Sequence, residues 1–119
     1  MKRSPERQAQ YYPKKKLNLK DNIKGAKMWA VALEKTMLTY FEVDPDSRFE
    51  LHSHKSEQIT LVLEGELFFD LTNKIVGVKK GEVMAMPSGM PHAVFTKNTR
   101  AKAVDAWSPV MQKYKDHIS

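Results

Sequence analysis

The sequence predicts an all-β protein, folded as a small antiparallel β-barrel or sandwich, and three observations lead to that prediction. The 119 residues fit one domain of ordinary size. After Lys27, no apolar pattern with the 3.6-residue period of a helix persists for several turns. Short apolar or alternating runs are instead separated by turn residues about every eight to twelve positions, as in strands joined by tight turns.

Each of these runs is expected to form one strand. In chain order the expected strands cover residues 28–33, 37–43, 48–54, 58–63, 66–72, 75–78, 82–86, 92–96 and 101–107. The turns between them are rich in residues such as glycine, proline and aspartate, as in Asp44-Pro45-Asp46-Ser47. Glu64-Gly65 is the two-residue connection of a tight hairpin, because glycine adopts a positive φ without strain.

Basic residues are concentrated near the N-terminus. The net charge of +6 comes from residues 1–25, which contain eight Lys or Arg and two acidic residues, whereas residues 26–119 contain twelve of each sign. We therefore divide the chain into a basic arm (1–25), a barrel domain (26–110) and a C-terminal tail (111–119). Lys14-Lys15-Lys16 either contacts RNA or an anionic surface or belongs to a solvated terminus. Since the domain itself is neutral, we expect no nucleic-acid partner.

Several other classes of protein are excluded by composition. No apolar run is long enough to span a bilayer, so no membrane association through a helix is expected. Gln8, Gln10 and Pro13 lie where a secretory signal needs an apolar segment, and we expect a cytoplasmic protein. The chain contains no cysteine, so a metal would need imidazole, carboxylate or amide ligands.

His52 and His54 are the first residues that indicate a chemical function. Alternate residues of a strand point to the same side about 6.5 Å apart, so both imidazoles can face the barrel interior. Gln58 begins the next expected strand, and His92 follows the turn that ends at Pro91. If the fold brings these strands together, three nitrogens and one amide oxygen form a ligand set for a transition metal. The alternative is a pair of surface histidines on an edge strand.

The spacing of these residues resembles the two motifs of the cupin superfamily across residues 28–109. The first motif, G-x5-H-x-H-x3,4-E-x6-G, is matched in spacing by Asp46, His52, His54, Gln58 and Gly65. The second, G-x5-P-x-G-x2-H-x3-N, is matched in spacing by Gly81, Pro87, Gly89, His92 and Thr96. The resemblance implies a double-stranded β-helix of the jelly-roll type and a homodimer. It also implies one divalent metal (Ni, Zn, Mn, Fe or Cu) bound by His52, His54, Gln58 and His92.

The chain departs from the cupin motifs at three of these positions. Asp46 replaces a turn glycine, and aspartate tolerates the left-handed conformation. Thr96 replaces an asparagine that does not bind metal in cupins. Gln58 stands at the usual glutamate ligand, and Glu57 is a poorer substitute because it breaks the motif spacing. An uncharged amide leaves the divalent charge intact, which favours Lewis-acid chemistry on anionic or carbonyl-bearing ligands over the oxygen chemistry in which cupins use that glutamate.

Strand alternation assigns further residues to the barrel interior. Gln58 carries Thr60 and Val62 with it, and Leu67, Phe69 and Leu71 lie across the hairpin. Met84 and Met86 share one face, and Val94 shares the face of His92. An apolar cavity beside the metal would bind a small molecule. Thr60, Phe69, Met86 and Trp107 are the candidate substrate contacts, with core packing as the alternative for Phe69 and Met86.

Asp105, which shares a strand face with Trp107, is the candidate catalytic acid or base. Facing inward it would move a proton near the metal, whereas the alternative is a strand-end carboxylate bonded to turn amides. Asp105-Ala106-Trp107-Ser108-Pro109 is similar to the D-x-F-S-P segment of small pectin-pathway cupins. Those cupins convert unsaturated monouronates to linear keto forms with three His and one Gln. They have an arginine where this chain has Met111, and Lys113 is the candidate substitute.

Two functional interpretations remain open, and a third is disfavoured. The first is an enzyme whose metal acts as a Lewis acid on a small anionic or carbonyl-bearing substrate, by ring opening, isomerisation or a lyase reaction, with sugar acids as one substrate class. The second is a cupin that binds or senses a small molecule without turnover, because a fold does not fix a function. Binding of nucleic acid or an anionic surface through the basic arm is disfavoured by the neutral domain.

Overall fold

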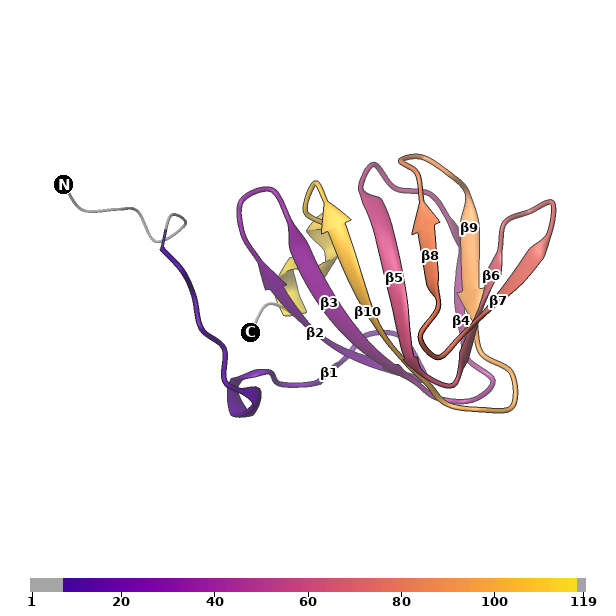
Figure 1. Ribbon diagram of the computed structural model, residues 1–119, viewed down its shortest axis with the longest axis horizontal. Coiled ribbons are helices and arrows are strands. Elements are labelled where there is room, and N and C mark those ends of the chain that lie inside the picture. The colour runs from indigo at the N-terminus through magenta and orange to yellow at the C-terminus, as the bar shows by residue number, and fades with distance from the viewer. Residues whose placement is uncertain (1–7, 118–119) are drawn as a thin grey trace.

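Residues 8–117 are described by a computed structural model, in which the chain folds into two antiparallel sheets that face each other (Figure 1). The larger sheet has the order β1 (Lys20–Asp21), β2 (Ala26–Ala32), β3 (Met37–Val43), β10 (Ala101–Ser108), β5 (Glu57–Glu64) and β8 (Val83–Met86). The smaller sheet has the order β4 (Arg48–His52), β9 (His92–Phe95), β6 (Glu66–Asp70) and β7 (Ile75–Lys79). The all-β antiparallel prediction is confirmed.

The core lies between the two sheets and follows the predicted alternation. On β3 the buried residues are Met37, Thr39, Phe41 and Val43, and the residues between them are exposed or half-buried. On β5 the buried residues are Gln58, Thr60 and Val62. Because side chains alternate with a period of two, the same strands that pack the core also carry polar groups to one place inside the barrel.

Two turns show the predicted positive φ angles. Gly65 joins β5 to β6 with a φ of +72°, and a side chain there would overlap the carbonyl oxygen of Arg100. Asp46 has a φ of +59°, which agrees with an aspartate in place of the turn glycine. Thr96 is buried, accepts a hydrogen bond from the Ser47 amide and donates one to the Asp44 carbonyl, so it ties this turn to the end of β9.

The third expected strand is shorter than predicted. Residues 48–54 were expected to be extended throughout, but β4 ends at His52 and His54 lies in the loop that follows. The pairing of β4 with β9 shifts between Phe49 and His52, and the ladder ends at the pair of His52 with His92, where β9 begins. His54 therefore reaches the interior from a loop rather than from the face of a strand.

The two ends of the described chain behave differently. The N-terminal segment runs away from the barrel before β1 pairs with β2, and it includes the short 3-10 helix η2 (Lys14–Lys16) (Figure 1). The segment treated as a C-terminal tail contributes to the core, because Met111 and Tyr114 are buried and the 3-10 helix η3 (Gln112–His117) contacts β2. Among the described residues, no helix is both long and apolar enough to cross a membrane.

Candidate metal centre

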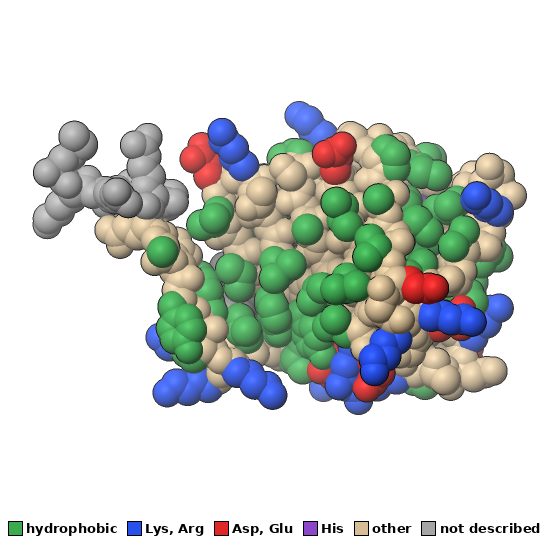
Figure 2. All heavy atoms as spheres, viewed as in Figure 1, with side chains coloured by type: hydrophobic (Ala, Val, Ile, Leu, Met, Phe, Trp, Pro, Cys, Tyr) green, Lys and Arg blue, Asp and Glu red, His purple; other side chains and the backbone are tan. Residues whose placement is uncertain are grey.

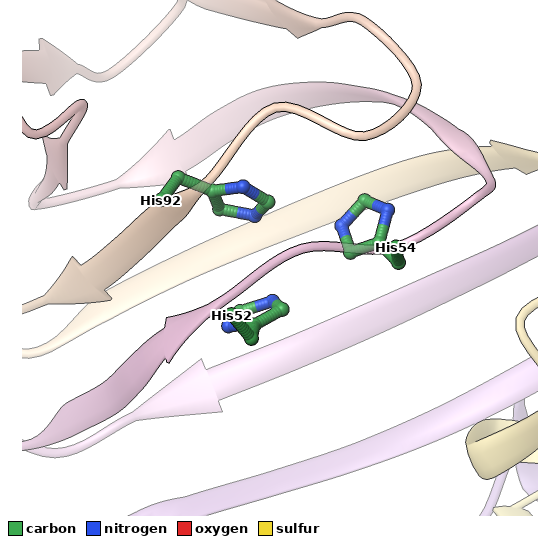
Figure 3. Close-up of side chains that lie close together, drawn as sticks. All are labelled: His52, His54 and His92. Carbon is green, nitrogen blue, oxygen red and sulfur yellow. The ribbon is translucent and has the colours of Figure 1, made fainter.

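Three histidines converge inside the barrel (Figure 3). His52 ends β4, His92 begins β9, and the register of the two strands pairs these residues directly. His54 comes from the loop after β4, and the three ring centroids lie 4.5–5.4 Å apart. One ligand nitrogen from each ring lies within 4.8 Å of the others, so the three imidazoles can share one metal ion.

Backbone carbonyls fix the tautomer of all three rings. The Nδ1 atom of His52 lies 2.6 Å from the carbonyl oxygen of Glu50, that of His54 lies 2.8 Å from Ser56, and that of His92 lies 2.8 Å from Met90. Because a carbonyl only accepts hydrogen bonds, each Nδ1 carries a proton, and in the neutral ring the lone pair is then on Nε2. A hydrogen bond from Nδ1 to a carbonyl is usual for histidines that bind a metal through Nε2.

Gln58 points its amide oxygen at the histidines. The Oε1 atom lies 3.1 Å from Nε2 of His54, while the Nε2 amide of Gln58 donates to Oγ1 of Thr60 at 2.9 Å and to Oδ1 of Asp105 at 3.4 Å. The two donor bonds decide which end of the amide faces the rings. The four predicted ligands therefore lie together, and three ring nitrogens with an amide oxygen suit a borderline transition-metal ion.

Asp105 lies behind Gln58 and is 6% exposed. Its carboxylate accepts hydrogen bonds from Thr39, Thr60 and Gln58, and Thr39 in turn accepts one from Nε1 of Trp107 at 2.8 Å. These partners are side chains of neighbouring strands and not turn amides. Burial raises the pKa of Asp105 to about 6, although the three hydrogen bonds oppose that shift.

Burial also lowers the pKa of His52 and of His92, which keeps both rings neutral and able to bind a metal at neutral pH. The positive charge of Lys113 acts in the same direction on both rings. The Lys113 ammonium lies 5.2 Å from the ring centroid of Tyr114, a residue of the cavity wall. This lysine thus contributes positive potential at the site without lying next to a ligand in sequence.

A cavity of about 440 Å³, its open mouth included, adjoins these groups. Of the predicted substrate contacts, Thr60, Phe69 and Trp107 line it, as do His52, Gln58, His92 and Asp105. Met86 is buried in the core cluster beside the cavity and is not among its lining residues. The remaining walls are Phe41, Val43, Phe49, Leu67, Val94, Ala103 and Tyr114.

Sequence reasoning did not identify Thr39 or Tyr114 as part of the site. Thr39 could have been found, because it alternates with Met37 and Phe41 and must share their inward face. Tyr114 lies in the segment expected to be a tail, and no periodic signal there predicts that it returns to the cavity.

Comparison of the sequence with protein-family models agrees with the fold and with the converging histidines. Residues 39–107 match the family model described as a cupin domain, which covers more than half of the chain. The chain belongs to the cupin family. It is similar in structure to KdgF from Halomonas sp., with a TM-score of 0.81 and 18% identity over 89% of this chain and 98% of that protein. An RmlC-like cupin from Shewanella frigidimarina gives a TM-score of 0.82 and 18% identity over 90% of this chain and 96% of that protein.

The sequence is also similar to curated proteins named acireductone dioxygenase. Acireductone dioxygenase 1 of Sorghum bicolor is 32% identical over 92 residues, which are 68% of this chain and 51% of that protein. Acireductone dioxygenase of Tuber melanosporum is 32% identical over 74 residues, or 52% of this chain and 43% of that protein. The chain spans about half the length of these relatives, so they establish the family rather than the reaction.

Proposed function

We propose that this cupin is a metal-dependent enzyme that catalyses a redox-neutral reaction on a small anionic or carbonyl-bearing molecule. His52, His54, His92 and the amide oxygen of Gln58 would hold one divalent transition metal. The reaction class is ring opening, isomerisation or elimination, and sugar acids are one substrate class. The convergence of three imidazole rings on one point, each with Nδ1 bonded to a backbone carbonyl and all beside an oriented amide oxygen, is the observation that supports this proposal.

A divalent ion held there supplies a Lewis acid that polarises a carbonyl or binds a carboxylate. The chain's own contribution is a proton-transfer group beside the cavity. A carboxyl group with a pKa of about 6 is mostly ionised at neutral pH yet close enough to it to accept and return a proton, so Asp105 has a suitable pKa for general acid–base catalysis.

Gln58 favours redox-neutral chemistry over oxygenation. An amide ligand leaves the positive charge of the ion unneutralised, which strengthens its attraction for an anionic substrate. The walls around it are mainly aromatic and aliphatic, so they exclude water and strengthen that attraction further. The Lys113 charge at the same site adds to the preference for an anion.

A non-catalytic binding protein is the second candidate. One observation favours it, since three side-chain donors already occupy the oxygens of Asp105. In a binder these bonds persist and Asp105 only orients Gln58. In an enzyme one of these hydrogen bonds must break when substrate binds, so that Asp105 can exchange a proton with it. Asp105→Asn distinguishes the two, because it abolishes turnover in the first case and leaves ligand affinity largely unchanged in the second.

The first experiment is elemental analysis of tag-free protein beside His92→Ala, with circular dichroism to verify the fold of the variant. We expect one metal ion per parent chain and none in His92→Ala. The metal-loaded protein is then assayed with unsaturated monouronates by loss of the absorbance of their conjugated unsaturated carboxylate, and with an acireductone in an oxygen electrode. Consumption of oxygen would replace the redox-neutral proposal by a dioxygenase. Metal-free parent protein that gains no stability from added Ni, Zn, Mn or Fe would overturn the metal-dependent mechanism.

A further inference from the structure

The strand registers divide the cavity beside the candidate metal centre into a polar part and an apolar part. On the smaller sheet, the polar part is the pair of His52 with His92. Two residues further along β9 lies Val94, which pairs with Phe49 of β4 and with Phe69 of β6. All three line the cavity, so its wall on this sheet changes from imidazole to hydrocarbon within one step of the strand alternation.

The larger sheet repeats this division. Asp105 pairs with Thr60 of β5, and both line the polar part. Two residues earlier on β10, Ala103 pairs with Phe41 of β3, and both line the apolar part. The apolar lining residues of the two sheets, with Val43 and Leu67 at the next inward positions of β3 and β6, are here called the apolar end.

The side chains of the polar part already bond to one another. The amide of Gln58 donates to Thr60 and to Asp105, and the Thr60 hydroxyl also donates to Asp105. The indole N–H of Trp107 donates to Thr39. These groups therefore have little hydrogen-bonding capacity left for a ligand.

The remaining polar atoms are directed at the position of the ion. Nδ1 of His52 and Nδ1 of His92 are bonded to backbone carbonyls, which leaves their Nε2 atoms and the Oε1 atom of Gln58 for a metal. Tyr114 adds one hydroxyl to the wall. Backbone groups of a sheet point toward neighbouring strands and not into the cavity. A ligand can thus be held by one polar group at the ion, whereas its other atoms meet the hydrocarbon of the apolar end.

This division of the wall discriminates between classes of ligand. A hydroxyl that is buried without a partner weakens binding about tenfold or more. A methylene buried at the same place strengthens it about threefold to fourfold, because apolar surface leaves water. A polyhydroxylated sugar acid would place several hydroxyls against the apolar end, and a hydrocarbon chain would place none there.

We propose, as a refinement that rests on the proposed function, that the substrate is a small carboxylate or keto acid with a hydrocarbon body. Its anionic head lies at the metal ligands and its body lies against the apolar end. The positive charge that Lys113 contributes at the histidines favours the same orientation of an anion. Among the substrate classes considered above, sugar acids are bound more weakly than such compounds.

Isothermal titration of the nickel-loaded, full-length protein with two matched acids tests this proposal. 2-Hydroxyhexanoate and gluconate share a 2-hydroxy carboxylate head and a chain of six carbons, and they differ only in the hydroxyls of the body. We expect 2-hydroxyhexanoate to bind at least about tenfold more tightly. 2-Hydroxybutyrate, which lacks two of the methylenes, should bind about tenfold more weakly than 2-hydroxyhexanoate.

Two substitutions at the apolar end test where the body binds. Val94→Thr adds a hydroxyl with little change of shape and should narrow the preference for 2-hydroxyhexanoate about threefold or more. Its matched control is Val83→Thr, because Val83 is 56% exposed on the outer face of the larger sheet, where Figure 2 shows many hydrophobic side chains. Ala103→Leu fills the apolar end and should weaken 2-hydroxyhexanoate more than gluconate, with the exposed Ala106→Leu on the same strand as control. Circular dichroism verifies the fold of each variant.

A second measurement does not depend on the metal. In protein kept metal-free by a chelator, saturation-transfer NMR reports which hydrogens of 2-hydroxyhexanoate contact the protein. We expect the terminal methyl to receive more saturation than the hydrogen at carbon 2, and Ala103→Leu to reduce the methyl signal. A methyl signal that is absent, or that Ala103→Leu leaves unchanged, would count against the apolar end as the binding site of the body.

The refinement and the proposed function can fail separately. Gluconate that binds nickel-loaded protein as tightly as 2-hydroxyhexanoate would overturn the hydrocarbon body and leave the metal-dependent enzyme standing, as would failure of both acids to bind. Methyl contact in a protein that never binds metal would overturn the metal-dependent enzyme and keep the apolar end as a binding site. Variants at Val94 and Ala103 that behave like their controls would also overturn the refinement.

Discussion

The Nε2 atom of His54 faces the Oε1 atom of Gln58 across 3.1 Å, and in the neutral ring with its proton on Nδ1 both atoms are hydrogen-bond acceptors. The Ser56 carbonyl holds the proton of His54 on Nδ1, and the donor bonds to Thr60 and Asp105 turn the amide oxygen of Gln58 toward the ring. Two lone pairs at this distance repel unless a cation lies between them or beside them. Neighbouring ligands of a metal at about 2.1 Å lie about 3 Å apart, so the separation fits a shared ion.

Removing the hydroxyl of Thr60 should release Gln58 from this orientation. Thr60→Val keeps the shape of the side chain but loses the acceptor for the Gln58 amide. We expect metal affinity to fall about 10- to 100-fold, as when other hydrogen bonds that orient a metal ligand are lost, and Thr60→Ser to retain most of the affinity. Titration with Ni or Zn against a competing chelator measures the effect. Equal affinities for the Val and Ser variants would show that the hydroxyl does not position the amide.

Asp105 disfavours a glutamate at position 58. Gln58→Glu would direct a carboxylate oxygen at Oδ1 of Asp105, in place of the amide that now donates to it. Repulsion between the two carboxylates raises the pKa of the pair. We expect tight metal binding but loss of the proposed turnover, with Gln58→Asn as a control that keeps the amide and shortens its reach. Unchanged turnover in Gln58→Glu would mean that neither the ligand charge nor Asp105 matters to the reaction.

Asp105 predicts how the stability of the metal-free protein depends on pH. Its folded-state pKa of about 6 exceeds the value of 3.8 assigned to the free side chain. The folded state therefore binds the proton more tightly, and the stability contributed by this group is present at low pH and decreases as the pH rises from about 4 to 6. The change is about 2–3 kcal/mol.

Asp105→Asn removes this titration. Urea unfolding in the presence of a chelator, at pH values from about 4 to 7, should show the stability of the parent falling relative to that of the variant. The gap should stop growing above pH 6. A difference between the two proteins that is constant over the whole range would contradict the raised pKa.

Gly65 lies in a crowded turn, whereas Gly81 lies in an open one. Both have positive φ angles, but an added side chain at Gly65 overlaps the Arg100 carbonyl whereas nothing lies within 4 Å at Gly81. Gly81→Ala should cost about 1 kcal/mol of stability for the conformation alone. Gly65→Ala should cost an additional 1–3 kcal/mol or so because the backbone must move. Thermal unfolding compares them, and similar losses would rule out a close approach at Gly65.

The sequence predicted most of the candidate metal centre, because the spacings that identify it follow from the local structure of single strands and turns. The spacing of His52, Gln58 and His92 depends on strand alternation and turn length, and the structure places all three around one point. His54 was expected on a strand and lies in a loop, because the partner strand β9 begins at His92 opposite His52, and the sequence does not show which strand pairs with β4.

Contacts made across the barrel were harder to predict. An inward Asp105 was one of two alternatives, and its bonds to Thr39 and Thr60 depend on the order of β3, β10 and β5, which alternation does not specify. Tyr114 reaches the cavity from a segment with no strand pattern. Alternation correctly assigned Met86 to the interior, but it does not show which interior residues line the cavity. Met86 packs in the core beside the cavity and not on its wall.

Strand β5 carries a candidate ligand and an exposed apolar residue at consecutive positions, Gln58 inside and Ile59 outside. Substitutions at either position affect one side of the sheet. A one-residue insertion before Gln58 within the strand would act on both sides, since every following side chain would exchange faces. Gln58 would then point to solvent and Ile59 into the cavity. Length variation is therefore expected to be tolerated in the loops of this protein and eliminated from β5, even where the inserted residue is itself a good strand former.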